Sequence, residues 1–205
     1  SRYQHLVLTK RDDRLRLYIN GHLQFSSRDE RIYHELLVHM PMHVAAKRER
    51  ILILGGGDGL ALREVLRYPL VKSVNLVDLD PAMIKLAQTQ PDLVALNQAA
   101  LSDARVSSSI AHGIGSGGRY TVERPSNLSR ALLDDQRYAL AEVDVLTVDA
   151  DQFVRKVSGT FDVVLVDLPD PKNIELAKLY SVDFYRALKA RINPGAVIAI
   201  QSTSP

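Results

Sequence analysis

From residue 51 onward, short apolar segments alternate with segments of helical character. Five apolar segments have the length and composition of buried strands: ILIL at 51–54, SVNLV at 73–77, VDVLTV at 143–148, FDVVLV at 161–166 and GAVIAI at 195–200. Helical segments lie at 60–68, 81–88, 151–157 and 180–191. Strands that alternate with helices in this way form a parallel sheet with helices on both faces. The sequence therefore predicts an α/β fold.

The first 27 residues follow a different pattern. Short alternating runs are separated by Arg11-Asp12-Asp13 and by Asn20-Gly21, which is typical of antiparallel hairpins. We therefore expect a small β-hairpin unit over 1–27, followed by the α/β domain over 28–205.

Three further expectations concern a helix after residue 29, an insertion and the C-terminal part of the fold. A helix is predicted to begin after Asp29, as its cap, and to be interrupted by Pro41. Residues 107–141 lack a clear periodicity and exceed the usual length of a connection, so we expect a flexible insertion there. The sequence ends just after the fifth apolar segment, whereas sheets of this type often have more strands. We expect the remaining C-terminal strands of the fold to be missing from it.

Composition and charge disfavour several classes of protein. The chain has no cysteine, which excludes disulfides, thiolate metal sites and cysteine nucleophiles. Its net charge of +2 is too small to predict a nucleic-acid partner. It contains no apolar stretch of about 18 residues and no signal-like start, so we expect a cytoplasmic protein. His34, His39 and His43 lack metal-site spacing and are predicted to make hydrogen bonds instead.

Glycines and acids follow four of the predicted strands. They are Gly55, Gly57 and Asp58 after the first, Asp78 after the second, Asp149 and Ala150 after the third, and Asp167 and Asp170 after the fourth. Ligands of open parallel sheets bind beyond the carboxyl ends of the strands, so we expect these residues to lie around one site. Glycines at the start of a helix let the backbone approach a ligand closely.

The acids indicate the chemistry of the ligands. Asp58 disfavours a pyrophosphate, and Asp78 stands about 20 residues beyond the glycines, where an acid normally binds ribose hydroxyls. This combination favours a nucleoside with a sulfonium group, although a generic nucleotide-binding domain stays open. Several carboxylates also suit a diamine, which is a dication at pH 7. One can hold its far ammonium group while another removes a proton from the attacking nitrogen.

Several longer motifs agree with this chemistry. They are Tyr3-Gln4-His5, NGHLQ at 20–24, DERIYHE at 29–35, ILGGGDG at 53–59, LREV at 62–65, VDLD at 77–80, Asp149-Ala150 and DLPDP at 167–171. In order and spacing they resemble the spermidine synthase family of polyamine aminopropyltransferases. The resemblance covers residues 3–205 apart from the insertion. It implies a Rossmann-like sheet of the class I methyltransferase type, a homodimer, and decarboxylated S-adenosylmethionine as co-substrate without a prosthetic group or metal.

The resemblance also implies a role for each motif residue. Asp167 is the acid/base that accepts the amine proton. The diamine is bound by Gln24, Tyr33, His34 and Asp170. The nucleoside is bound by Gln4, Gly55, Gly57, Asp58, Asp78, Asp149 and Ala150, with Asp78 on the ribose, Asp149 on the adenine amino group, and Gln4 and Asp58 near the aminopropyl arm.

The implied reaction transfers an aminopropyl group to a diamine such as putrescine, giving spermidine and methylthioadenosine. A methyltransferase that uses S-adenosylmethionine and a non-catalytic family member that binds nucleosides or polyamines are the alternatives. Asp78 stands where the family usually has Glu, and Leu168-Pro169 replaces a pair that is usually small and polar. The latter variant resembles a bacterial branch that is often fused to membrane-spanning segments, so such segments are expected in the parent chain.

Overall fold

A six-stranded parallel sheet forms the centre of the computed structural model, which describes residues 1–102, 106–107, 141–171 and 174–201. Its strands are β4 (Arg50–Gly55), β5 (Ser73–Asp78), β6 (Val106–Ser107), β7 (Glu142–Thr147), β8 (Phe161–Asp167) and β9 (Ile192–Ile200). The five predicted strands are confirmed, and the two-residue β6 was not predicted. Residues 108–140 of the predicted insertion lie outside the described residues.

The direction in which successive strands are added to the sheet reverses at β4, near the centre of the sheet. The order is β6-β7-β5-β4-β8-β9, so the chain proceeds from β4 through β5 to β7 and then returns to the other side of β4 with β8 and β9. β4 and β8 are neighbours, and their register pairs Gly55 with Asp167. In an open α/β sheet the ligand site lies where the direction of winding reverses.

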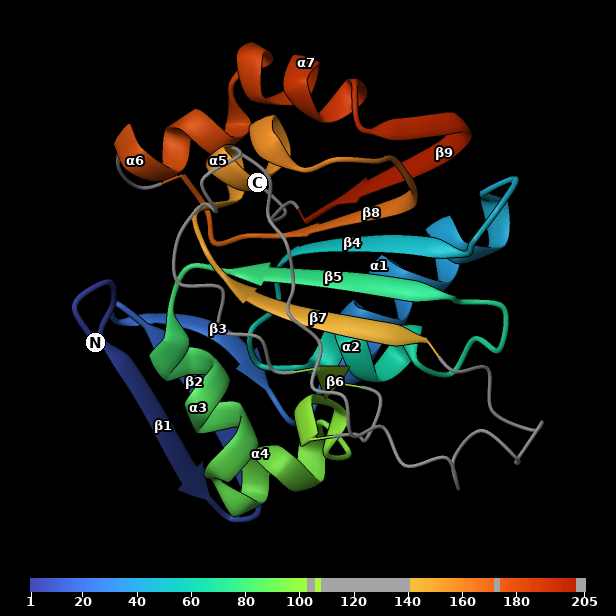
Figure 1. The fold of residues 1–205 in the computed structure, drawn as a ribbon. Coiled ribbons are helices and arrows are strands. Elements are labelled where there is room, and N and C mark those ends of the chain that lie inside the picture. Colours follow the sequence, from blue (N-terminus) through green and yellow to red (C-terminus); the bar gives the residue numbers. More distant parts are fainter. Residues whose placement is uncertain (103–105, 108–140, 172–173, 202–205) are drawn as a thin grey trace.

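Helices cover both faces of the sheet (Figure 1). Those packed on the first face are α1 (Glu30–Val44), α2 (Leu60–Val65), α3 (Pro81–Thr89) and α4 (Pro91–Leu96), with the short η1 (Ala100–Ser102). Those on the second are α5 (Ala150–Lys156) and α7 (Val182–Lys189), with α6 (Ile174–Ala177) and η3 (Lys178–Tyr180). Successive strand residues serve opposite faces: Ile51 and Ile53 pack on the first, Leu52 and Leu54 on the second. This explains why the strands are continuously apolar.

The N-terminal unit is a three-stranded antiparallel sheet, as predicted. It consists of β1 (Leu6–Arg11), β2 (Arg14–Ile19) and β3 (His22–Ser26), in that order. Both residues of the turns at Asp12-Asp13 and Asn20-Gly21 have positive φ, as two-residue hairpins require. Leu15 and Leu17 are buried in the same apolar cluster as the first face of the large sheet. The division of the chain at residue 28 stays a prediction.

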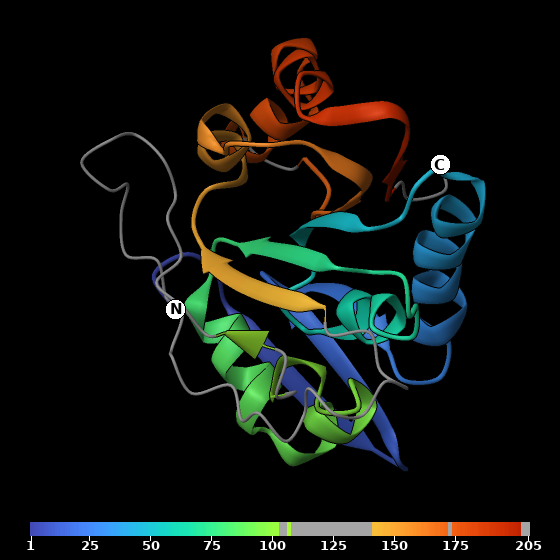
Figure 2. The same ribbon diagram turned by 45° about the vertical axis from the view of Figure 1, so that its right-hand side comes forward.

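Helix α1 begins directly after Asp29, as predicted, but it extends further than the sequence predicts. It continues through Pro41 to Val44, so the prediction that Pro41 interrupts it was wrong. The lost backbone donor is tolerated near the end of the helix, where Pro41 and Met42 are buried and the Ala45 amide donates to the Pro41 carbonyl at 2.9 Å. Asp29 occupies the N-cap position, but its side chain makes no capping hydrogen bond. Figure 2 shows α1 beside α2 on the first face.

None of the helices in the described part of the chain is both long and apolar enough to cross a membrane.

Candidate active site

Most of the predicted site residues lie along the edge where the parallel strands end. Gly55, Asp78 and Asp167 are the last residues of β4, β5 and β8, and Asp149 follows β7 just before α5. The ends of β5 and β7 point to the left in Figure 1. The structure therefore places these residues at one edge of the sheet, as predicted.

The glycine turn after β4 is shaped by the strand ends on either side. Gly55 has a φ of 86°, and a Cβ there would lie 2.0 Å from the main-chain oxygen of Asp167. A Cβ on Gly57 would lie 2.5 Å from Asp78 Oδ2. Real Cβ atoms do not approach this closely, so the protein itself favours glycine at both positions, in addition to any approach of a ligand. The obstacle is backbone at Gly55 and a side chain at Gly57.

Asp78 is held in a fixed orientation. Its Oδ2 accepts a hydrogen bond from the Gly57 amide at 2.9 Å, and its Oδ1 accepts one from the Asp80 amide at 2.8 Å. Burial raises the pKa of Asp78 to about 6, although these two donors oppose the shift. A carboxylate has about four acceptor positions, so two remain for ligand hydroxyl groups.

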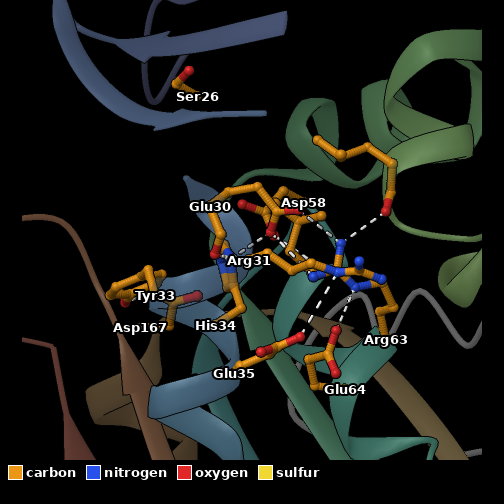
Figure 3. A network of polar contacts seen from close by, with 12 residues as sticks. Ser26, Glu30, Arg31, Tyr33, His34, Glu35, Asp58, Arg63, Glu64 and Asp167 are labelled. Atoms are coloured by element: carbon orange, nitrogen blue, oxygen red, sulfur yellow. Dashed lines mark hydrogen bonds and ion pairs between the residues drawn. The ribbon is translucent and has the colours of Figure 1, made fainter. Parts of the chain in front are cut away.

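Tyr33 on α1 contacts Asp167 at the end of β8 (Figure 3). The Tyr33 hydroxyl donates to Asp167 Oδ1 at 2.6 Å, and the two side chains are half-buried. Burial and the negative charge of Asp167 raise the pKa of Tyr33, which keeps its hydroxyl protonated as a donor. The ring of Tyr33 also meets that of His34 edge to face, with centroids 4.6 Å apart.

Asp58 and His34 complete this group. Asp58 Oδ1 accepts from the Leu60 amide at 2.9 Å. Burial raises the pKa of Asp58 to about 6; the charge of His34 opposes this rise and that of Asp167 adds to it. His34 Nδ1 lies 2.7 Å from the Glu30 carbonyl oxygen and 2.9 Å from Glu30 Oε2. The charge of Asp167 is thus close enough to Tyr33, His34 and Asp58 to raise the pKa of each.

On the second face of the sheet, Asp149 caps helix α5. Its Oδ1 accepts from the Gln152 amide at 3.1 Å, and Lys178 Nζ lies 2.7 Å from its Oδ2. Ala150 is the buried first residue of the helix. Lys178 is not among the residues predicted for the site, because nothing in the sequence links it to Asp149.

Tyr180 holds the turn that carries Asp170. Its hydroxyl donates to the carbonyl oxygens of Leu168 and Pro169, both at 3.1 Å. Burial, followed by the charges of nearby groups that include Asp170, raises the pKa of Tyr180 to about 12. The unusual Leu-Pro pair is therefore fixed through its backbone by a residue that the sequence analysis does not assign to the site.

The two predicted glutamines have different surroundings. Ser1 contacts the main chain of Gln4 and donates to Asp80 Oδ2 at 2.6 Å, which places the Gln4 segment beside the start of α3. Gln24 Nε2 donates to the His22 carbonyl oxygen of its own strand at 3.4 Å. In the described residues, no hydrogen bond joins either glutamine to Asp78 or Asp167. Their roles in binding stay predictions.

A buried ion-pair network beside the site was missed. Glu30 on α1 and Arg63 and Glu64 on α2 are all at most 4% exposed. The sequence feature that could have indicated this network is the charged pair Arg63-Glu64 within an otherwise apolar helix. His39 contacts Tyr68 and Glu64, in line with the predicted hydrogen-bonding role. Over the described ranges no cluster of three or more potential metal ligands is present.

The fold and the site together define the class of the protein. A parallel sheet that reverses its winding beside a glycine turn, with a fixed acid at the end of the next strand, is a Rossmann-like fold of the class I methyltransferase type. A family model described as the spermine/spermidine synthase domain matches residues 30–121 and 127–205. The chain belongs to the spermine/spermidine synthase family.

Individual relatives agree with this assignment. The chain is 44% identical over 205 residues to polyamine aminopropyltransferase 2 of Ralstonia nicotianae, and 40% identical to a polyamine aminopropyltransferase of Oceanobacillus iheyensis. Each alignment covers 100% of this chain and 33% of the relative. The chain therefore spans about a third of the length of these curated relatives.

Solved structures show the same fold. A spermidine synthase in complex with the transition-state analogue AdoDATO matches with a TM-score of 0.65 and 26% identity, covering 95% of this chain and 53% of that one. The spermidine synthase of Thermotoga maritima matches with a TM-score of 0.65 at 23% identity, covering 97% of this chain and 52% of that one.

Proposed function

We propose that this protein transfers the aminopropyl group of decarboxylated S-adenosylmethionine to a diamine such as putrescine. The observation that carries the proposal is the hydrogen bond from Tyr33 to Asp167, directly beside the glycine turn. It supports the proposal because a half-buried carboxylate beside the glycine turn would be within reach of both substrates. The names of the relatives and their shared fold support the same activity.

The nucleoside side of the proposal rests on the acids at the ends of β5 and β7. Asp78 has acceptor positions that would suit ribose hydroxyls, and Asp149 would accept from the adenine amino group, in competition with Lys178. Asp58, with Gln4, would face the aminopropyl arm. The donor carries a sulfonium and an ammonium charge, so carboxylates at these positions stabilise its binding by charge complementarity.

The amine side rests on Tyr33, Gln24 and Asp170, which would orient the diamine towards the donor, with His34 beside them. Asp167 accepts a proton from the amine, and the neutral nitrogen then attacks the carbon beside the sulfonium. A C–N bond forms as the C–S bond breaks, and the bonding electrons leave with methylthioadenosine as a neutral thioether. The leaving group is already activated, so catalysis consists mainly of positioning and deprotonation.

The test is a turnover assay of the full-length gene product with decarboxylated S-adenosylmethionine and a panel of diamines, detecting methylthioadenosine. Asp167→Asn should keep the affinity for the donor and reduce turnover by about 10²–10⁴-fold, the usual contribution of a general base. Asp183→Asn is the control, because Asp183 is an exposed acid on α7 that pairs with Arg186.

Each alternative gives a different result. Full turnover in Asp167→Asn would remove Asp167 from its role. Much tighter binding of S-adenosylmethionine than of its decarboxylated form would favour a methyltransferase. Binding of both substrates without any methylthioadenosine would identify a non-catalytic binding protein.

A further inference from the structure

Glu30 and Arg63 form a buried, two-point ion pair beside the site (Figure 3). Arg63 Nη1 lies 3.0 Å from Glu30 Oε1, and Nη2 lies 3.1 Å from Oε2. The two side chains are only 3% and 2% exposed. Arg63 also donates to the Leu96 carbonyl oxygen at 2.8 Å and to Glu64 Oε1 at 2.7 Å. Glu30 is therefore held rigidly by α2 and α4.

Such a pair is poorly explained by stability alone. Removing two charges from water is costly, and apolar side chains of similar volume often fill the same space at least as favourably. The pair instead has a contact that apolar residues could not replace: Glu30 Oε2 lies 2.9 Å from His34 Nδ1, and the Glu30 carbonyl oxygen lies 2.7 Å from the same atom. Both oxygens are acceptors, so Nδ1 carries the proton that it donates to them.

His34 faces charged or titratable groups from several elements. Glu30 and Tyr33 are on its own helix, Asp58 comes from the turn after β4, and Asp167 comes from the end of β8. Burial lowers the pKa of His34, but the hydrogen bond to Glu30 and the charges of Asp58 and Asp167 outweigh this and raise it overall. The surroundings thus favour an imidazolium ion next to the acids of the site.

We propose that Glu30, fixed by Arg63, is a positioning residue that holds His34 as a cation beside Asp58 and so keeps Asp58 ionised for cationic substrates. The inference deepens the proposed function and rests on it. A cationic imidazole cannot accept a hydrogen bond from an ammonium group. His34 therefore acts on the substrates through the neighbouring carboxylate of Asp58.

The groups that shift the pKa of Asp58 indicate how this pKa should change when Glu30 is replaced. After burial, the charge of His34 has the largest effect on the pKa of Asp58 and lowers it. The direct repulsion by Glu30 is the smallest of the leading effects and raises it. Glu30→Gln removes both influences, because a neutral amide no longer favours the imidazolium. The net result is a higher pKa for Asp58 and a less negative site at neutral pH.

Glu64→Gln is a matched control. Glu64 is also a buried carboxylate bound to Arg63, at 2.7 Å and 1% exposure, but it pairs on its other side with Arg67 and has no hydrogen bond to His34. Both variants remove one buried acid from the same guanidinium. A merely structural role predicts similar effects from both, whereas the positioning role predicts an effect on His34 from Glu30→Gln alone.

The experiment is an NMR titration of the histidine rings in the full-length protein, with the His34 signal assigned by its loss in His34→Asn. In the wild type the midpoint of His34 should lie above the ordinary value of about 6.5. Glu30→Gln should lower it by about one pH unit or more, Glu64→Gln should leave it unchanged, and Glu30→Asp, which keeps the charge, should restore most of it. A wild-type midpoint at or below about 6.5, or equal shifts in the two glutamine variants, would overturn the proposal.

A second readout uses calorimetry with decarboxylated S-adenosylmethionine across pH. Glu30→Gln should weaken binding by about tenfold at pH 7, and the deficit should shrink as the pH rises and Asp58 ionises again. A deficit that is independent of pH would contradict the inference. The titration requires no turnover, so it still decides the role of Glu30 if the wild type releases no methylthioadenosine and the proposed function fails. If Glu30→Gln does not fold, the wild-type midpoint and the Glu30→Asp variant remain decisive.

Discussion

At the scale of single residues, different neighbours favour glycine at Gly55, the last residue of β4, and at Gly57 in the turn that follows. A methyl group on Gly55 would meet the main chain of Asp167 at 2.0 Å, and the positive φ of Gly55 adds strain. A methyl group on Gly57 would meet side chains alone, with Asp78 Oδ2 at 2.5 Å and Met83 Cγ at 3.2 Å. Backbone of a central strand cannot move aside, whereas a carboxylate can rotate.

The two alanine variants should therefore differ. Gly55→Ala should lower the free energy of unfolding by about 2 kcal/mol or more, since β4 and β8 must separate. Gly57→Ala should cost less stability but weaken donor binding by about tenfold, because Asp78 is displaced from its two backbone donors. Urea unfolding and calorimetry measure the two effects, and equal losses of stability would contradict this distinction.

The sequence predicted the acids at the strand ends because parallel strands necessarily bring their carboxyl ends to one edge. It did not predict the Glu30–Arg63 pair, whose partners are 33 residues apart and meet only because α1 packs against α2. The contact between Lys178 and Asp149 depends in the same way on how η3 lies against α5. Local patterns indicate where a strand ends, but not which side chains from other elements reach that end.

At the scale of elements, Asp78 and Asp80, two acids between β5 and α3, have different roles. Asp80 is fully buried, and its Oδ1 accepts from the Ala82 amide at 3.0 Å, which caps helix α3. Asp78 faces the site and is only half-buried. Asp80→Ala should lower the free energy of unfolding by about 1–2 kcal/mol, the usual loss for an N-cap, and change donor affinity little.

Asp78→Ala should instead reduce donor affinity by tenfold or more, because it removes the acceptors proposed for the ribose hydroxyls. Urea unfolding and calorimetry of both variants provide the comparison. The distinction fails if Asp80→Ala weakens donor binding as much as Asp78→Ala does.

Elements were predicted better than their ends. The apolar segments gave all five longer strands, because continuous burial leaves a clear signal. The extension of α1 through Pro41 was not predictable, since it depends on burial of Met42 against the core. The two-residue β6 carries too few residues for any periodicity to be visible in the sequence.

At the scale of the whole molecule, stability should depend on pH in an unusual direction. Burial raises the pKa values of Asp58 and Asp78 to about 6, above the value of about 3.9 that they have in the unfolded chain. Between these values the folded state binds more protons than the unfolded state, so its stability falls as the pH rises. The raised pKa of His34 acts in the same direction at higher pH.

We therefore expect the free energy of unfolding to fall by about 1–3 kcal/mol between pH 5 and pH 7. Urea titrations at several pH values measure the change, and Asp58→Asn should flatten it. A stability that rises through this range would contradict the raised pKa values. Below about pH 4 the trend should reverse, because hydrogen bonds and ion pairs lower the pKa values of Glu30, Glu64 and Asp162 despite their burial.

The register that pairs Gly55 with Asp167 has a mechanical consequence for a two-substrate reaction. The turn that would hold the donor follows β4, and the carboxylate that would deprotonate the acceptor ends β8. These adjacent strands lie about 4.8 Å apart and are joined by a ladder of hydrogen bonds. Thermal motion should therefore move Gly55 and Asp167 together, so the distance between them varies less than the position of either residue. Under the proposed function, the choice of amine would depend on segments outside β4 and β8, such as α1 and the turn held by Tyr180, which can change without altering this distance.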